Sequence, residues 1–71
     1  METTTIYIVQ AWDERYGFWG NTAERPEGMF ATPKVGYDTE AEGRGRLAAR
    51  QGANPDGKYR LVRQVTTVEV I

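Results

Sequence analysis

The sequence has 71 residues and contains neither cysteine nor histidine. Without thiols no disulfide can staple the fold, and without thiols and imidazoles the usual zinc ligands are missing. The same absence removes the commonest side chains for nucleophilic and acid–base catalysis. We therefore expect no metal site, no cofactor and no enzymatic activity. A small secreted domain would ordinarily carry disulfides, so we also expect a cytoplasmic protein.

Long apolar segments are absent as well. No run of about 18 apolar residues occurs, so we expect no membrane-spanning helix. Residues 1–5 read METTT, without basic charge or a long apolar stretch, and we expect no signal peptide. The length predicts a single domain over residues 1–71, and a domain this small removes only about 60% of its chain's surface from water. Its stability should come from an aromatic core or from association with a partner.

The net charge of −1 conceals two oppositely charged halves. Residues 1–42 hold eight acidic and three basic side chains, a net of −5, whereas residues 43–71 hold two acidic and six basic ones, a net of +4. The two halves either neutralise each other within the fold or bind oppositely charged surfaces of partners.

Several short segments of the first half have strand character. Residues 6–12, IYIVQAW, carry apolar side chains on both faces of an extended chain, which predicts a strand with neighbours at both edges. The polar residues 13–17 end in glycine and predict a hairpin turn into a second strand at residues 18–23. Residues 25–28, RPEG, predict another turn, followed by a third strand at residues 29–32.

A helix is predicted at residues 40–51. Thr39 and Glu42 have the spacing of a capping box, in which two side chains satisfy free amide groups at a helix start. Gly52 stands where a helix would end in a left-handed residue. We expect the helix to lie close on the sheet through a stripe of small residues, with Leu47 beside it: Ala41, Gly45, Ala48 and Gly52.

The last segment should be a turn followed by a long strand. Residues 54–57, NPDG, predict a type I turn with Gly57 at the position that needs positive φ. Residues 58–71 are rich in valine and threonine, as strands are. Because the apolar residues change face between Val65 and Val68, we expect a bulge near residues 66–67. Together these elements predict an α+β fold: an antiparallel sheet of three to four strands in the order β-β-β-α-β, with one helix packed on one face.

The aromatic residues of the first hairpin are the main candidate site. They either pack across the strands as a small core, or bind a protein partner, or stack on nucleic-acid bases. For partner binding we select the aromatic anchors and a charged rim: Trp12, Tyr16, Phe18 and Trp19, with Glu14 and Arg15.

A second candidate site is basic. It would bind nucleic acid through phosphate contacts, unless these side chains form a solvated face with partners inside the chain. Its members are Arg44, Arg50, Lys58, Arg60 and Arg63.

Two resemblances concern most of the chain. The order of elements and the segment YDTEAEGRGRLAA, which opens the predicted helix, resemble small uncharacterised phage and prophage accessory proteins. Residues 6–51 resemble, more weakly, the three-stranded sheet and helix of the N-terminal DNA-binding domain of phage-type integrases. That family lays its sheet in the DNA major groove, whereas residues 1–37 here carry five acidic and three basic side chains. This departure disfavours groove binding, because phosphate contacts require positive charge.

These observations predict a small non-enzymatic protein-interaction module, of the phage or mobile-element accessory type, that binds or inhibits a host protein or associates with itself. The alternative is a nucleic-acid-binding domain that uses the basic helix and strand residues. Neither reading implies a membrane or a small-molecule cofactor.

Overall fold

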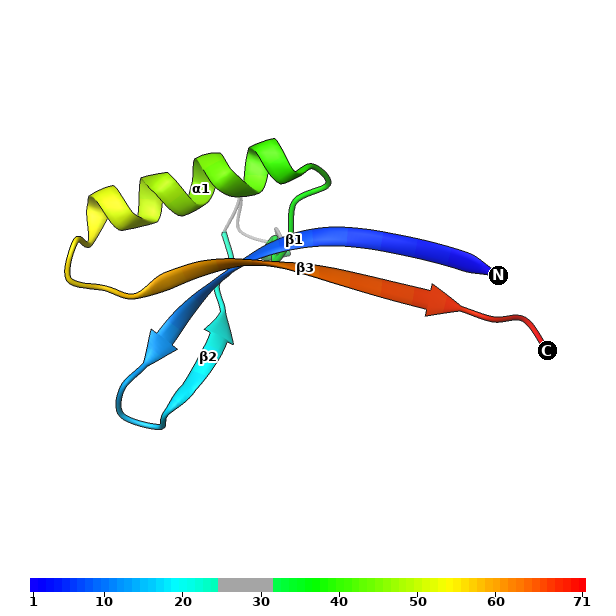
Figure 1. Ribbon diagram of the computed structural model, residues 1–71, viewed down its shortest axis with the longest axis horizontal. Helices are drawn as coiled ribbons and strands as arrows, with labels where there is room; N and C mark the ends of the chain where they lie inside the picture. The colour runs from blue at the N-terminus through cyan, green and yellow to red at the C-terminus, as the bar shows by residue number, and fades with distance from the viewer. Residues whose placement is uncertain (25–31) are drawn as a thin grey trace.

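The structure is a computed structural model that describes residues 1–24 and 32–71. A three-stranded antiparallel sheet in the order β2-β1-β3 carries one helix across one face (Figure 1). This confirms the α+β prediction, with the order β-β-α-β among the described residues. The turn predicted at residues 25–28 and most of the third strand predicted at residues 29–32 lie outside them. The elements are β1 (Glu2–Asp13), β2 (Phe18–Asn21), α1 (Glu40–Ala53) and β3 (Tyr59–Val68).

The middle of β1 carries the core. Ile8 is 2% exposed and Val9 is fully buried. Here β1 has neighbours on both edges, because β3 lies along one side while Tyr37 returns to the other. The amides and carbonyls of Tyr7 and Tyr37 exchange two hydrogen bonds of 2.9 Å. Tyr37 is itself buried, so the core forms where the backbone is paired on both sides.

The outer half of the sheet is a two-stranded ribbon that extends past the helix (Figure 1). Residues 2–5 of β1 pair there with residues 65–68 of β3, and all of them are exposed. The pairing is regular through Thr3↔Thr67 and Thr4↔Thr66, so the predicted bulge at residues 66–67 is wrong. The prediction assumed that the valines of this segment must share one buried face. Neither face of the ribbon is covered, so they need not do so.

The predicted helix start is confirmed. The Glu42 amide donates to Thr39 Oγ1 at 3.2 Å, and the Thr39 hydroxyl donates to Glu42 Oε1 at 3.1 Å. The predicted end is wrong, since Gly52 lies inside α1 and the Asn54 amide caps the helix by donating to the Arg50 carbonyl at 3.0 Å. With this cap the helix needs no left-handed residue.

The helix face in contact with the sheet also differs from the predicted stripe. Gly43 is the buried helix residue, and a Cβ there would lie 2.8 Å from Leu61 Cδ1 and 3.1 Å from Tyr7 Cβ. Gly45 and Gly52, by contrast, have nothing within 4 Å of such an atom. The half-buried neighbours of Gly43 are Arg46, Leu47 and Arg50. Leu47 and the arginine stems offer the sheet more apolar carbon than the alanine–glycine stripe would.

The turn before β3 is confirmed by the hydrogen bond from the Gly57 amide to the Asn54 carbonyl, at 3.0 Å. The positive φ predicted for Gly57 is wrong, because Gly17 is the one residue with positive φ in the described ranges. Glycine is needed at 57 for space instead. A Cβ there would lie 2.7 Å from Tyr59 Cε2 and 2.8 Å from Asn54 Nδ2.

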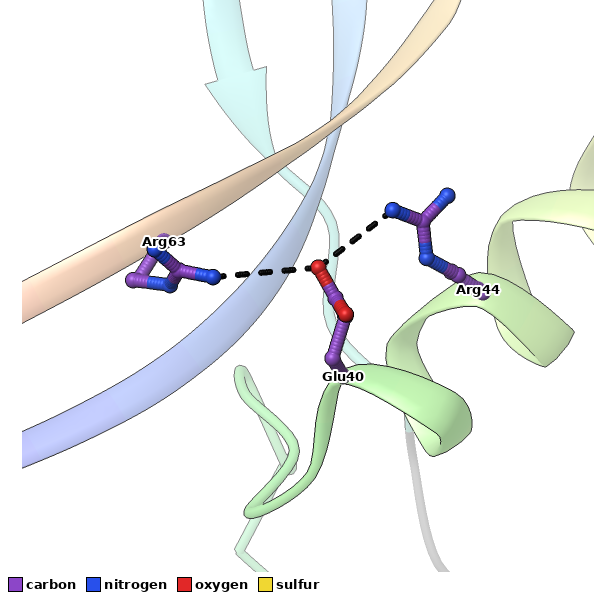
Figure 2. A network of polar contacts seen from close by, with 3 residues as sticks. All are labelled: Glu40, Arg44 and Arg63. Atoms are coloured by element: carbon purple, nitrogen blue, oxygen red, sulfur yellow. Dashed lines mark hydrogen bonds and ion pairs between the residues drawn. The ribbon is translucent and has the colours of Figure 1, made fainter.

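The two oppositely charged halves of the sequence form ion pairs with each other, which is the first of the two alternatives given for them above. Each ion pair found in the described ranges joins a base of residues 43–71 to an acid of residues 1–42. Figure 2 shows the Glu40 carboxylate between two guanidinium groups, with Arg44 at 3.3 Å and Arg63 at 3.8 Å. The other pairs are Arg46 with Glu24 and Lys58 with Glu14.

Candidate functional site

The hairpin between β1 and β2 is built around Asp13. Its carboxylate oxygen Oδ1 accepts hydrogen bonds from the amides of Arg15 at 2.9 Å and Tyr16 at 3.1 Å. Its carbonyl accepts from Gly17, whose φ of 70° closes the turn at little steric cost. The polar turn with a terminal glycine is thus confirmed. This turn, which includes Tyr16, joins β1 and β2 at the end of the hairpin away from α1 (Figure 1).

The four predicted aromatic anchors form two separate pairs. Trp12 and Trp19 are directly opposite in the ladder, with ring centroids 5.4 Å apart and planes tilted by 60°. Tyr16 and Phe18 form the second pair, with centroids 6.4 Å apart. Because neighbouring residues of a strand point to opposite faces, Phe18 and Trp19 lie on opposite sides of the hairpin.

The tryptophan pair belongs to a packed polar layer. Both rings are half-buried, and the Arg60 guanidinium lies 4.3 Å from the centroid of Trp19. Arg60 Nε also donates to Gln10 Oε1 at 2.8 Å, and Gln10 Nε2 donates to Asn21 Oδ1 at 2.9 Å. These contacts fix the pair across three strands, which is the role expected of a cross-strand staple.

The phenylalanine side is open. Phe18 is 51% exposed and Tyr16 is 69% exposed. Beside Phe18 lies a hollow of about 410 Å³. Ala11 and Gly20 stand opposite each other beneath it, and their small size leaves the space that larger residues would fill. The remaining lining residues are Trp12, Asp13, Glu14, Asn21 and Thr22.

The predicted rim residues lie at the turn next to this hollow. Arg15 carries its guanidinium 5.6 Å from the Tyr16 ring centroid. Glu14 lines the hollow and faces Lys58 at 3.9 Å, with both side chains largely exposed. Such an exposed pair contributes little stability, so Glu14 is free to exchange this contact for a basic group of a partner. The open side of the hairpin therefore combines two aromatic rings with an acidic edge.

The five predicted nucleic-acid contacts are distributed over the molecule. Arg44 and Arg63 share Glu40 on the helix side of the sheet, while Arg60 lies over Trp19 on the other side. Lys58 faces Glu14. The Arg50 guanidinium donates to the Ala23 carbonyl at 3.3 Å. Each of these cations contacts its own chain.

A polar cluster beneath α1 has no counterpart in the sequence prediction. Burial raises the pKa of the Tyr37 hydroxyl, and the neighbouring Glu24 carboxylate raises it further, while Arg46 and Arg50 act in the opposite direction. Arg46 also forms the ion pair with Glu24, and Lys34 lies 5.2 Å from the Tyr37 ring centroid. The cluster ties residues 24 and 34–37 to the helix. Nothing in the local sequence relates Glu24 to Arg46, because only the fold brings them together.

Over residues 1–24 and 32–71, no three acidic side chains come together as a metal site would require. The same ranges contain no helix with the length and apolar character to cross a membrane. No family model matches the sequence, and no match was found among curated proteins or among solved structures.

Proposed function

We propose that this chain is a non-enzymatic protein-interaction module that binds a partner on the open side of its hairpin. The exposed Tyr16–Phe18 pair beside the hollow is the observation that carries this proposal. Exposed aromatic rings next to a concave surface are typical of residues that dominate binding energy. The partner would insert an apolar side chain over Ala11 and Gly20.

The acidic side chains at the edge of the hollow indicate what kind of peptide would bind there. Asp13 and Glu14 line it, so a peptide with a basic residue beside its apolar one fits best. The resemblance to phage accessory proteins supports a cytoplasmic host protein as the target. On this proposal the tryptophan pair holds the hairpin in shape, and Tyr16 and Phe18 make the contact.

A displayed library of random peptides, selected against the immobilised full chain, tests the proposal. Selected peptides should carry an apolar residue next to lysine or arginine. Their affinity for the Phe18→Ala variant should be lower by about tenfold or more, because the substitution removes the largest apolar side chain beside the hollow. Val35→Ala is the control, since Val35 is also an exposed apolar residue but lies outside the hairpin and outside the β3 edge. A library that yields no binder, or binders indifferent to Phe18→Ala, would exclude the hairpin as the site.

Nucleic-acid binding is the second candidate, and the stack of Arg60 on Trp19 favours it. Aromatic and arginine planes are what single-stranded bases stack on. The hairpin reading is preferred, because the basic residues form no single face: Arg44 and Arg63 lie on the helix side of the sheet and Arg60 on the other. An electrophoretic shift with a single-stranded oligonucleotide in low salt decides the matter. Retardation that weakens steeply with salt and is lost in Arg60→Ala would establish binding, and no retardation would dismiss it.

A further inference from the structure

The outer edge of β3 is an open strand. In the part of the chain that the structure describes, β3 pairs only with β1, which leaves the opposite edge of all ten residues without a neighbour. Natural edge strands are usually protected by lysine, proline or a bulge. The first half of β3 carries Arg60 and Arg63, but its second half, residues 64–68 (QVTTV), contains no charged side chain and no proline, and the pairing of this strand shows no bulge. Val65 and Val68 are both more than half exposed.

The hydrogen bonds fix which residues of this edge can bind another strand. The Trp12 amide donates to the Lys58 carbonyl at 2.9 Å. In this ladder even-numbered residues of β1 lie opposite even-numbered residues of β3, so the even-numbered pairs are the hydrogen-bonded ones. Tyr7, an odd-numbered residue of β1, bonds away from β3, to Tyr37. Odd-numbered residues of β3 therefore direct their amides and carbonyls outward. An added antiparallel strand must match its own bonding residues to Arg63, Val65 and Thr67.

A second copy of the chain meets this condition with complementary charge. In a two-fold antiparallel pairing centred on Thr66, with each strand extended past Val68 to Val70, Arg63 lies opposite Glu69 of the second copy. The same pair recurs on the other side of the axis. Val65 then faces Thr67, and Val62 faces Val70. Each hydrogen-bonded pair in this register joins two odd-numbered residues, the ones whose amides and carbonyls point outward from the β3 edge. A pairing centred on Arg63 would instead place like charges opposite each other.

We propose that two copies of this chain associate through their β3 edges in this register, forming one continuous antiparallel sheet. Arg63 lies 3.8 Å from the Glu40 carboxylate (Figure 2) and 5.6 Å from the Tyr7 ring centroid. Because its side chain is 59% exposed, the dimer would exchange the long Glu40 contact for Glu69 of the second copy. The gain is largest at the ribbon, because a two-stranded ribbon is only marginally stable and a small core benefits from association. This edge is separate from the hairpin, so its test does not depend on the proposed function.

Charge exchange tests the pairing. Sedimentation of the full chain up to millimolar concentration should show a reversible dimer. Glu69→Lys and Arg63→Glu should each weaken dimerisation by about tenfold, because each places like charges opposite each other twice. An equimolar mixture of the two variants should dimerise again, since every cross-strand pair in the mixed dimer is opposite in charge. Circular dichroism of each variant checks that the Arg63 change leaves the fold intact.

A single cysteine tests the register, because the sequence contains none of its own. In Thr66→Cys the two thiols face each other across the axis as a non-bonded pair, the geometry in which an antiparallel disulfide forms readily. Gln64→Cys is the control on the same strand face, where the proposed register separates the two thiols by about four residues, or roughly 13 Å. Mild oxidation should link Thr66→Cys much faster. A chain that stays monomeric, a mixture that does not recover, or equal linking of the two cysteine variants would overturn the proposal.

Discussion

The two ends of the β1–β3 ladder have the same backbone pairing and very different surroundings. Around Ile8 and Val9 the strand has neighbours on both edges, α1 crosses one face, and both side chains are buried. Around Thr3 and Thr4 the pairing to β3 continues in the same register, yet every side chain is exposed. Strand pairing alone therefore makes no core. The helix approaches the face of Tyr7, Val9 and Leu61. Ile8 points to the opposite face and is buried where the chain also returns at Tyr37 to pair with β1.

The largest effect should come from the buried end. Ile8→Ala should lower the free energy of unfolding by about 2–5 kcal/mol, because it leaves a cavity where the surroundings cannot collapse. Val65→Ala, in the exposed ribbon, should change it by no more than about 0.5 kcal/mol in dilute solution. Urea unfolding followed by tryptophan fluorescence measures both. Similar losses would show that the ribbon contributes to the core after all.

The close approach of the helix can be broken at one glycine. Gly43→Val should destabilise the protein by about 1–3 kcal/mol, since its side chain would overlap Leu61 and crowd Tyr7. Gly45→Ala, with open space around it, should instead stabilise by up to about 1 kcal/mol through helix propensity. Thermal unfolding of the two variants gives the comparison. If both shift the melting temperature in the same direction, the helix does not cross at Gly43.

The helix start should matter by a smaller amount. Thr39→Ala removes the acceptor of the Glu42 amide and should cost about 1 kcal/mol. Thr39→Ser keeps the hydroxyl and should remain close to the original stability. Chemical denaturation of both variants provides the measurement. A Thr39→Ala variant as stable as Thr39→Ser would mean that packing alone defines the first turn.

The smallest effect should appear at alkaline pH. Burial raises the pKa of Tyr37, so the folded protein holds this proton more tightly than the unfolded chain. That contribution is complete below the unfolded value of about 10 and is lost as the pH rises through the folded pKa. In Tyr37→Phe the free energy of unfolding should fall less steeply between about pH 9 and pH 11. Urea unfolding across this range would contradict the assignment if the two slopes agree.

Local signals predicted the elements well. The capping pair Thr39 and Glu42, the turn at residues 54–57 and the glycine of the hairpin turn act over a few residues, so the sequence contains the information that decides them. The face of α1 that packs on the sheet could not be predicted in this way, because it depends on the contact of Gly43 with Leu61 of a strand distant in the sequence. The prediction of a bulge at residues 66–67 was wrong because both faces of the ribbon are exposed there. The alternation of apolar and polar residues indicates strand geometry only where one face is buried.

The sequence predicts which aromatic residues gather at the hairpin, but it does not predict how they are arranged. The aromatic cluster was recognised from composition, but strand alternation divides it between two faces, and only the partner of Trp19 across the ladder decides which pair is packed. The exposed hollow depends on the small residues Ala11 and Gly20, which come together only through the pairing of β1 with β2. The ion pair of Glu24 with Arg46 joins residues that nothing local relates.

The pairing of Glu2 with Val68 has a consequence for how the chain acquires its structure. The central strand is made before the other described elements, while its longest neighbour is made after them. Until residues 59–68 have left the ribosome, Ile8 and Val9 lack the strand beside which they are buried. Because ladders between distant segments close slowly, folding should be slow for a chain of this length. During that interval the apolar middle of β1 is exposed to other chains.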